Sequence, residues 1–271
     1  MASTAKRPWY MFYPLAGMIL LSLVWCGYWF IAFSGAKELI QAKRLEFAGQ
    51  GMALTCARET WGGFPFRFEF QCETAKLQFI HDTQTYNVQT TKILGIAQAY
   101  NPLHVIFLVD GPTSIDQTTV IHDRALISVK INTRLDLAAD TTELTVIRPD
   151  NPPITVSSAE LVGHTSGQTL EISRLKISQG AVDFAATGTV SLDAQHRLAG
   201  KLSSQTNDLD GVMEFIEPIF ALNEQDRTTI TNLVTLTGKD PATNTTKADF
   251  VAKEGALYWG LIKLADLTPL Y

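Results

Sequence analysis

The sequence has little charge in its N-terminal part and little basic charge elsewhere. Charged residues make up 18% of the chain, against about 25% in ordinary soluble proteins, and none occurs between Arg7 and Lys37. The first 44 residues hold five of the 22 basic and one of the 27 acidic residues, so the rest of the chain carries a formal net charge of −9. An acidic chain without a basic run cannot neutralise a row of phosphates, which excludes nucleic acid as a partner.

Motifs for catalysis and metal binding are also missing. The five histidines occur singly, and no two of them lie four residues apart, as metal ligands on one helix face do. His81 and His122 each precede an aspartate, but neighbouring side chains on a strand face opposite sides, so we interpret both as surface turn residues. We therefore expect neither an enzyme nor a cofactor.

An uncharged apolar segment covers residues 9–33. At about 1.5 Å per residue it is long enough to cross a hydrocarbon core of about 30 Å, and aromatic residues crowd both of its ends, as they do at membrane interfaces. We predict a cytoplasmic tail at residues 1–8 and a transmembrane helix at residues 9–33. A cleaved secretory signal is the alternative, because Lys6 and Arg7 precede the segment and small residues follow it, but its apolar part is longer than is typical of cleaved signals.

Only three cysteines occur, and two of them, Cys56 and Cys72, lie outside the apolar segment. They flank a predicted turn at residues 61–65, and a disulfide that closes a loop of this length contributes about 3 kcal/mol. A zinc site is excluded because two thiols without clustered histidines supply half of the ligands. Since disulfides persist in oxidising compartments, we predict a Cys56–Cys72 bond on the far side of the membrane, with Cys26 as a reduced thiol within it.

The remainder of the chain is predicted to be mainly β. Helix formers at residues 34–51, ending in Gly49 and Gly51, predict that the membrane helix continues as a helical stalk. Alternation of apolar and polar residues then predicts strands at 64–72, 126–131, 144–147, 170–177, 182–192 and 250–262.

Apolar residues at intervals of three and four predict a helix pair at residues 209–236, with Asn223 as a cap and Gly238 as a stop. No linker divides residues 52–271, for which we predict one α+β domain: a curled, mostly antiparallel sheet with the helix pair near its C-terminus.

A row of phenylalanines is the main candidate for a binding site. Phe64, Phe66, Phe68 and Phe70 alternate with polar residues and fall on one face of a predicted strand. Four bulky rings need a large apolar partner surface. That surface is either the protein's own core or a groove that holds acyl chains or another hydrophobe.

Several short motifs resemble the family called domain of unknown function 2125. They are Cys56, residues 63–67, Cys72, residues 97–102, His104, residues 110–112 and residues 253–260. The resemblance implies a membrane-anchored, β-rich envelope protein of alphaproteobacteria, and it brings no known activity. The C-terminal part, with Gly188 and Gly200 in strands before the helix pair and a last hairpin, is also similar to AsmA-like envelope proteins of the lipid-transfer type.

From these features we expect a single-pass protein of the bacterial inner membrane whose C-terminal domain lies in the periplasm. Its leading function is non-enzymatic binding of lipid or another hydrophobe, with the bilayer as partner of the N-terminal helix. The alternative is an accessory or structural subunit that docks on an inner-membrane protein through its helix and stalk. An open apolar side of the sheet favours the first function, and a filled one favours the second.

Overall fold

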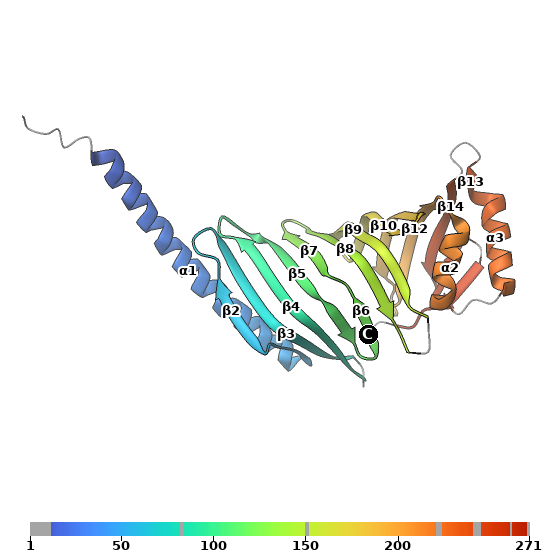
Figure 1. Cartoon of the computed structure of the whole chain (residues 1–271), viewed down its shortest axis with the longest axis horizontal. Coiled ribbons are helices and arrows are strands. Elements are labelled where there is room, and N and C mark those ends of the chain that lie inside the picture. Colours follow the sequence, from blue (N-terminus) through green and yellow to red (C-terminus); the bar gives the residue numbers. More distant parts are fainter. Residues whose placement is uncertain are drawn as a thin grey trace, which may run out of the picture.

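The computed structural model describes residues 12–269 except 82–83, 150–151, 221–223, 241–244 and 261. A long helix comes first, sixteen strands form one sheet, and two short helices interrupt the last part of it (Figure 1). The helices are α1 (Tyr13–Gly49), α2 (Leu209–Phe220) and α3 (Glu224–Gly238). The strands are β1 (Met52–Thr55), β2 (Arg58–Gly62), β3 (Arg67–His81), β4 (Gln84–Gln98), β5 (Asn101–Ile115), β6 (Thr118–Ile121), β7 (Arg124–Ile131), β8 (Leu135–Ile147), β9 (Ile154–Ser166), β10 (Thr169–Gln179), β11 (Val182–Leu192), β12 (Leu198–Thr206), β13 (Lys239–Asp240), β14 (Thr245–Lys253), β15 (Ala256–Trp259) and β16 (Ile262–Asp266).

Most of the predicted elements are confirmed. Residues 13–33 of the apolar segment and residues 34–49 of the stalk form one continuous helix, α1, which is long and apolar enough to cross a membrane, while residues 9–11 lie outside the described residues. The predicted helix pair corresponds to α2 and α3, and α3 ends at Gly238 as expected. The predicted strand at 182–192 is β11, whereas the one at 250–262 is divided among β14, β15 and β16. The predicted cytoplasmic tail and the Asn223 cap lie outside the described residues.

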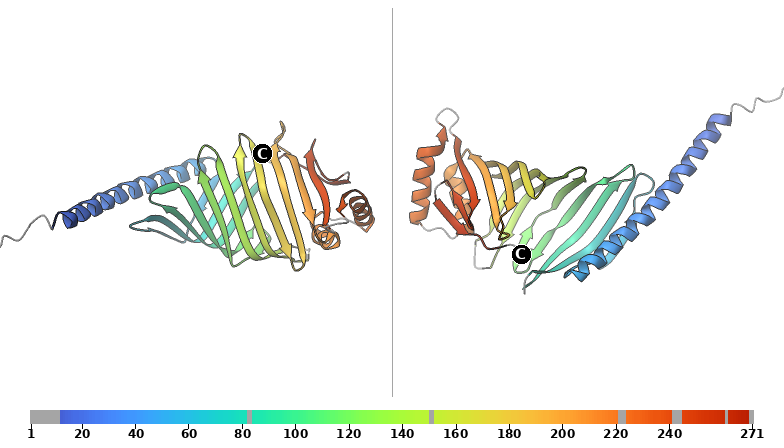
Figure 2. Two further views of the ribbon diagram at one scale, coloured as in Figure 1. Left: turned by 90° about the horizontal axis from the view of Figure 1, so that it is seen from above. Right: turned by 180° about the vertical axis from the view of Figure 1, so that it is seen from behind.

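The sheet is antiparallel and follows the chain from one strand to the next. Its order is β1-β3-β4-β5-β6-β8-β9-β10-β11-β12-β14-β15-β16, with β2 beside β3 and β7 between β5 and β8. Most neighbouring strands are therefore joined by short turns, whereas α2 and α3 lie in the connection between the neighbours β12 and β14. Figure 2 shows that it is strongly curved, with α1 at one end and the α2–α3 pair at the other.

One side of the sheet is apolar along its whole length. Directly opposed residues of an antiparallel pair share a face, so the pairing register can be followed from strand to strand. One such row is Phe68, Ala97, Val105, Val129, Leu137, Gly163, Ile172, Gly188, Leu202, Phe250 and Trp259. The next row is Phe70, Gly95, Phe107, Ile127, Ala139, Leu161, Leu175, Ala186, Ser204 and Ala248. We call the side that carries these two rows the apolar face.

The packed core of the described residues lies at the C-terminal end of the apolar face. There α2 and α3 cover β11, β14 and β15 and form one buried cluster, which consists of Leu209, Val212, Met213, Ile216, Ile230, Val234, Trp259 and Leu264. Phe184 and Phe250 pack against this cluster from the sheet. The core thus stabilises the last strands and leaves the middle of the sheet outside it.

Candidate functional site: an apolar sheet face between two helical ends

The middle of the apolar face, on β4 to β10, is incompletely buried. Apart from Ile172, which is buried, its large side chains keep part of their surface exposed; they are Ile93, Val105, Phe107, Val109, Ile127, Val129, Leu137, Leu161, Leu175 and Ile177. No described helix lies over this stretch, because α1 and the α2–α3 pair cover only the two ends (Figures 1 and 2). A face of this composition is normally packed against another layer. The described part of the chain supplies such a layer only at the ends.

The opposite side of the sheet has a different distribution. On β4, β5 and β7 it carries a shorter apolar patch that includes Leu94, Leu108 and Leu126. The residues that continue this patch through the strand pairing from β8 onward are charged; they are Asp140, Glu160 and Lys176. Only the apolar face therefore connects α1 with the helix pair.

An apolar pocket of about 210 Å³ marks the C-terminal end of the apolar face. It lies between α2 and the sheet and is lined by Ile177, Gln179, Val182, Phe184, Val212, Phe215, Ile216 and Phe250. Ile177 and Phe184 are opposed residues of β10 and β11 that continue the apolar face into the pocket. A hydrophobic chain lying on the sheet can therefore end beneath α2.

At the other end, α1 packs on the predicted phenylalanine row. Trp29 is the buried residue of α1, and its ring lies 5.2 Å from that of Phe64 and 5.7 Å from that of Phe68. The ring of Phe66 lies 6.3 Å from that of Trp25. The described partner of Phe70 is the ring of Trp61 on β2, at 4.7 Å. The row is thus in contact with the protein's own aromatic residues, and ligand binding by these four residues stays a prediction.

The predicted strand at 64–72 starts too early, because Phe64 and Phe66 belong to the turn between β2 and β3. Gly63 has φ of 103°, a conformation that favours glycine, and a Cβ there would lie 2.4 Å from the Arg67 carbonyl oxygen. Pro65 lacks the N–H that a ladder needs. Trp61, which we placed in the turn, pairs with Phe70 instead, and the turn consists of residues 63–66.

Polar groups of α1 bind the backbone at this end of the sheet. The indole nitrogen of Trp25 donates to the Pro65 carbonyl at 2.9 Å, and that of Trp29 donates to the Arg67 carbonyl at 3.1 Å. The hydroxyl of Tyr28 donates to the Ala99 carbonyl, in the turn between β4 and β5, at 2.8 Å. The sequence signal was present, since these residues lie three and four positions apart on one helix face, but we interpreted the aromatic cluster only as a membrane-interface belt.

A second pocket lies between α1 and the β2–β3 turn. Its volume is about 760 Å³, and it is lined by Leu21, Ser22, Val24, Trp25, Cys26, Tyr28, Phe64, Pro65 and Phe66. Ser22 donates its hydroxyl to the Met18 carbonyl within the helix, so the lining is almost entirely apolar. The two pockets thus flank the apolar face, one beside α1 and one beneath α2.

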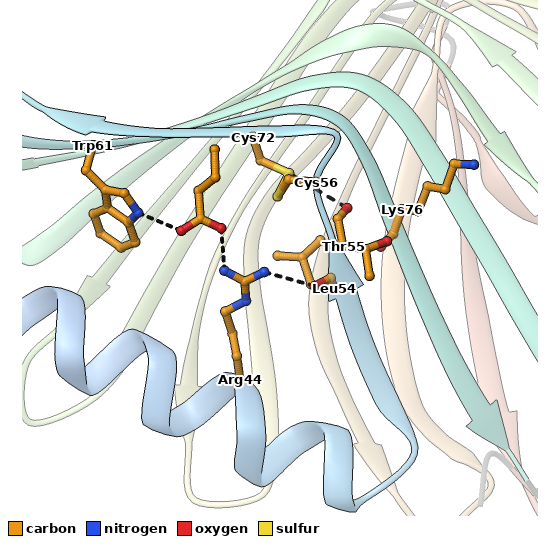
Figure 3. The surroundings of a disulfide bond; sticks show 8 residues. Arg44, Leu54, Thr55, Cys56, Trp61, Cys72 and Lys76 are labelled. Carbon is orange, nitrogen blue, oxygen red and sulfur yellow. Dashed lines mark hydrogen bonds and ion pairs between the residues drawn. A yellow bond between two sulfur atoms is a disulfide. The ribbon is translucent and has the colours of Figure 1, made fainter.

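The predicted disulfide is present beside the base of α1 (Figure 3). Cys56 and Cys72 are bonded with their Cα atoms 5.2 Å apart, and Cys26 is free. Arg44 of α1 donates to Glu59 at 2.6 Å and to the Leu54 carbonyl at 3.0 Å. Burial raises the pKa of Glu59, but hydrogen bonds from Arg44 and Trp61 outweigh this effect and hold its pKa below the ordinary value. Together these contacts fix the end of α1 to β1 and β2.

Our interpretation of His122 as a surface turn residue is wrong. His122 is 8% exposed, and its Nε2 lies 2.9 Å from the Thr113 hydroxyl. Burial lowers its pKa, although the carboxylates of Asp110 and Asp123 oppose the shift. The backbone at His122 can approach β5 closely because Gly111 has no side chain. A Cβ at position 111 would lie 2.1 Å from the His122 carbonyl oxygen. The side chain of His81 and residue Asp82 lie outside the described residues.

Metal ligands do not gather anywhere in the part of the chain that the structure describes. The fold and the candidate site define a class: an open antiparallel sheet with a long apolar N-terminal helix at one end and a helix pair at the other. The chain belongs to the family described as "Uncharacterized protein conserved in bacteria (DUF2125)", which matches residues 29–165 and 161–268. No match to a curated protein or to a solved structure was found.

Proposed function

We propose that this protein is anchored in the bacterial inner membrane by α1 and binds lipid or another hydrophobe on the apolar face of a periplasmic sheet, without catalysis. The observation that carries the proposal is the continuous apolar face on β4 to β10, whose large side chains, except Ile172, keep part of their surface exposed. Removing apolar surface from water lowers the free energy by about 25 cal/mol per Å². A bound acyl chain supplies the missing layer.

Two further features support the anchor and the compartment. Helix α1 is long and apolar enough to cross a membrane, and its side chains from Tyr13 to Val24 are exposed. The Cys56–Cys72 disulfide is of a kind that persists outside the cytoplasm. Both are consistent with a helix in the membrane and a sheet in the periplasm.

Two neighbouring alanines on β8 provide a matched test. Ala139 lies on the apolar face between Ile127 and Leu161, whereas Ala138 lies on the opposite face between Ser128 and Val162. Both side chains are half-buried, so Ala139→Glu and Ala138→Glu add the same carboxylate to the same strand. Native mass spectrometry of the detergent-extracted full chain then measures the lipid bound to each variant.

We expect Ala139→Glu to lose bound lipid, because the carboxylate resists burial under an acyl chain, and Ala138→Glu to keep it. Thermal unfolding of both variants checks that the sheet is intact. Equal lipid content in the two folded variants, or none in the unmodified chain, contradicts lipid binding on the apolar face.

An accessory or structural subunit of an inner-membrane complex is the second candidate. It is favoured by β16, which in the described residues pairs only with β15 and leaves one strand edge open. Such an edge can accept a strand from a partner. The same mass spectra distinguish the two functions, because a stoichiometric protein partner without lipid supports this candidate.

A further inference from the structure

We propose that the β2–β3 turn, residues 63–66, inserts into the lipid leaflet from which α1 emerges, with the β4–β5 turn beside it. The proposal rests on the membrane anchoring of α1 and does not require a ligand on the apolar face. Its partner is the bilayer itself, contacted by the end of a sheet and not only by the helix.

The depth of the turn follows from its attachment to α1. Trp25 and Trp29 bind the carbonyls of Pro65 and Arg67, and both tryptophans lie inside the uncharged segment. The next charged residue, Lys37, is eight positions beyond Trp29, or about 12 Å along a helix. A turn bound at this level therefore lies at the depth of the apolar segment. Arg67, which follows the turn at the level of Trp29, is charged, 59% exposed and paired with Glu69, so we expect the turn to reach the interface of the leaflet and not its centre.

The surface of the turn suits lipid. Phe64 is 51% exposed and Phe66 is 63% exposed, although each is a large apolar side chain. Tyr100, in the adjoining β4–β5 turn, is 67% exposed, and Leu103, near the start of β5, is 55% exposed. Exposed aromatic residues gathered at one end of a sheet mark an interaction surface, and aromatic rings favour the membrane interface.

Backbone carbonyls at the turn also have hydrogen-bond partners within the protein. A carbonyl placed in hydrocarbon without a hydrogen-bond partner costs several kcal/mol. The carbonyls of Pro65, Arg67 and Ala99 accept hydrogen bonds from Trp25, Trp29 and Tyr28. The helix thus supplies donors that water supplies to an ordinary surface turn.

The other ends of the same strands, away from the β2–β3 and β4–β5 turns, provide a control. Ile115 is 42% exposed and is the last residue of β5. It pairs with Val88 and Thr118, at the end of β5 that lies away from the β4–β5 turn. On that side β1 follows the last residues of α1, about 30 Å along the helix from Trp29. Ile115 is therefore an exposed apolar residue of the same sheet that lies outside the bilayer.

Site-specific fluorescence on the full chain tests the proposal. In a Cys26→Ala background, Phe66→Cys, Tyr100→Cys, Ile115→Cys and Met18→Cys are each labelled with an environment-sensitive dye and reconstituted in phosphatidylcholine vesicles. Nitroxide-labelled phosphatidylcholine quenches a dye in the leaflet, and aqueous iodide quenches a dye in water. Met18, 68% exposed in the middle of the apolar segment, reports whether α1 is in the membrane.

We expect the labels at positions 18, 66 and 100 to lose fluorescence with the lipid nitroxide and to be protected from iodide, and the label at 115 to behave in the opposite way. Quenching at 18 without quenching at 66 and 100 overturns the insertion of the turn and leaves the anchor intact. Absence of lipid quenching at 18 overturns both. Lipid quenching at 115 equal to that at 66 shows general adsorption of the sheet and overturns the specific insertion.

Discussion

The two ends of the sheet are both covered by helices on the apolar face, but they are completed differently. Where α2 and α3 cover the sheet, Met213 of α2 and Ile230 of α3 are fully buried and Trp259 of β15 is 1% exposed. Where α1 meets the sheet, Trp29 of α1 is 3% exposed, while Phe64 and Phe66 of the β2–β3 turn remain more than half exposed. The C-terminal end is a core made by the protein itself, whereas the N-terminal end is joined by hydrogen bonds and leaves its apolar surface partly uncovered.

This difference shows what each end contributes. Fully buried apolar side chains stabilise the fold through area removed from water and through close packing. Hydrogen bonds from indole and hydroxyl groups to carbonyls fix the orientation of α1 on the sheet and contribute only modestly to stability. We therefore assign stability mainly to the C-terminal end and positioning to the N-terminal end.

The largest expected effect is at the C-terminal core. Met213→Ala should lower the free energy of unfolding by about 2–5 kcal/mol, because it leaves a cavity among fully buried neighbours. Phe66→Ala, at a position 63% exposed, should change it by less than about 1 kcal/mol in detergent. Chemical denaturation of the two variants measures the difference. Equal losses of stability would contradict our assignment of stability mainly to the C-terminal end.

Removal of the disulfide should rank next. Replacing Cys56 and Cys72 together by alanine should cost about 3 kcal/mol, since the bond closes a loop with a sequence separation of 16. The measurement is denaturation of the double variant beside that of the unmodified chain with and without reductant. If reductant destabilises the double variant as much as the unmodified chain, the loss does not come from this bond.

Phe68 sharpens the comparison at the α1 end. Phe68→Ala should lower stability by about 1–2 kcal/mol, because the half-buried ring contacts Trp29 and Phe33. Phe68→Asp should in addition weaken the contact between α1 and β3, which a change in tryptophan fluorescence detects. Unchanged stability combined with loss of bound lipid would instead support our prediction that the phenylalanine row binds a ligand.

The smallest effect concerns Glu59. Its pKa in the folded protein is lower than the ordinary value of 4.5, so its contribution to stability is present above that pH and disappears as the pH falls through the folded pKa. Glu59 is partly exposed, which limits the contribution to about 1 kcal/mol or less. Glu59→Gln should therefore show a shallower loss of stability below pH 4.5. Parallel pH profiles of the two proteins would contradict this role.

Local patterns were sufficient to predict several elements of this fold. Helix α1 follows from the uncharged segment and the helix formers after it, and β11 follows from the alternation of apolar and polar residues at 182–192. The helix pair follows from apolar residues three and four positions apart. The spacing of Cys56 and Cys72 around a turn indicated their bond.

Features that depend on long-range packing could not be derived in this way. The apolar face exists only because the register of many strand pairs brings residues such as Phe107, Leu137 and Leu161 onto one side, and bulges shift that register in β5 and β10. The position of α1 on the phenylalanine row depends on contacts 38 and 40 residues apart in sequence. His122 is buried because a glycine eleven positions earlier leaves room for it.

Helix α1 also has a mechanical consequence. It is one uninterrupted helix of 37 residues, about 55 Å long, and it is attached to the sheet both at Trp25 to Trp29 and at Arg44. Two attachments about 25 Å apart restrict rotation of the sheet relative to α1. If α1 spans the bilayer as we propose, a bilayer of different thickness would make the helix tilt to match the hydrocarbon core. The sheet would then rotate together with α1, so the thickness of the bilayer would set the angle between the apolar face and the membrane.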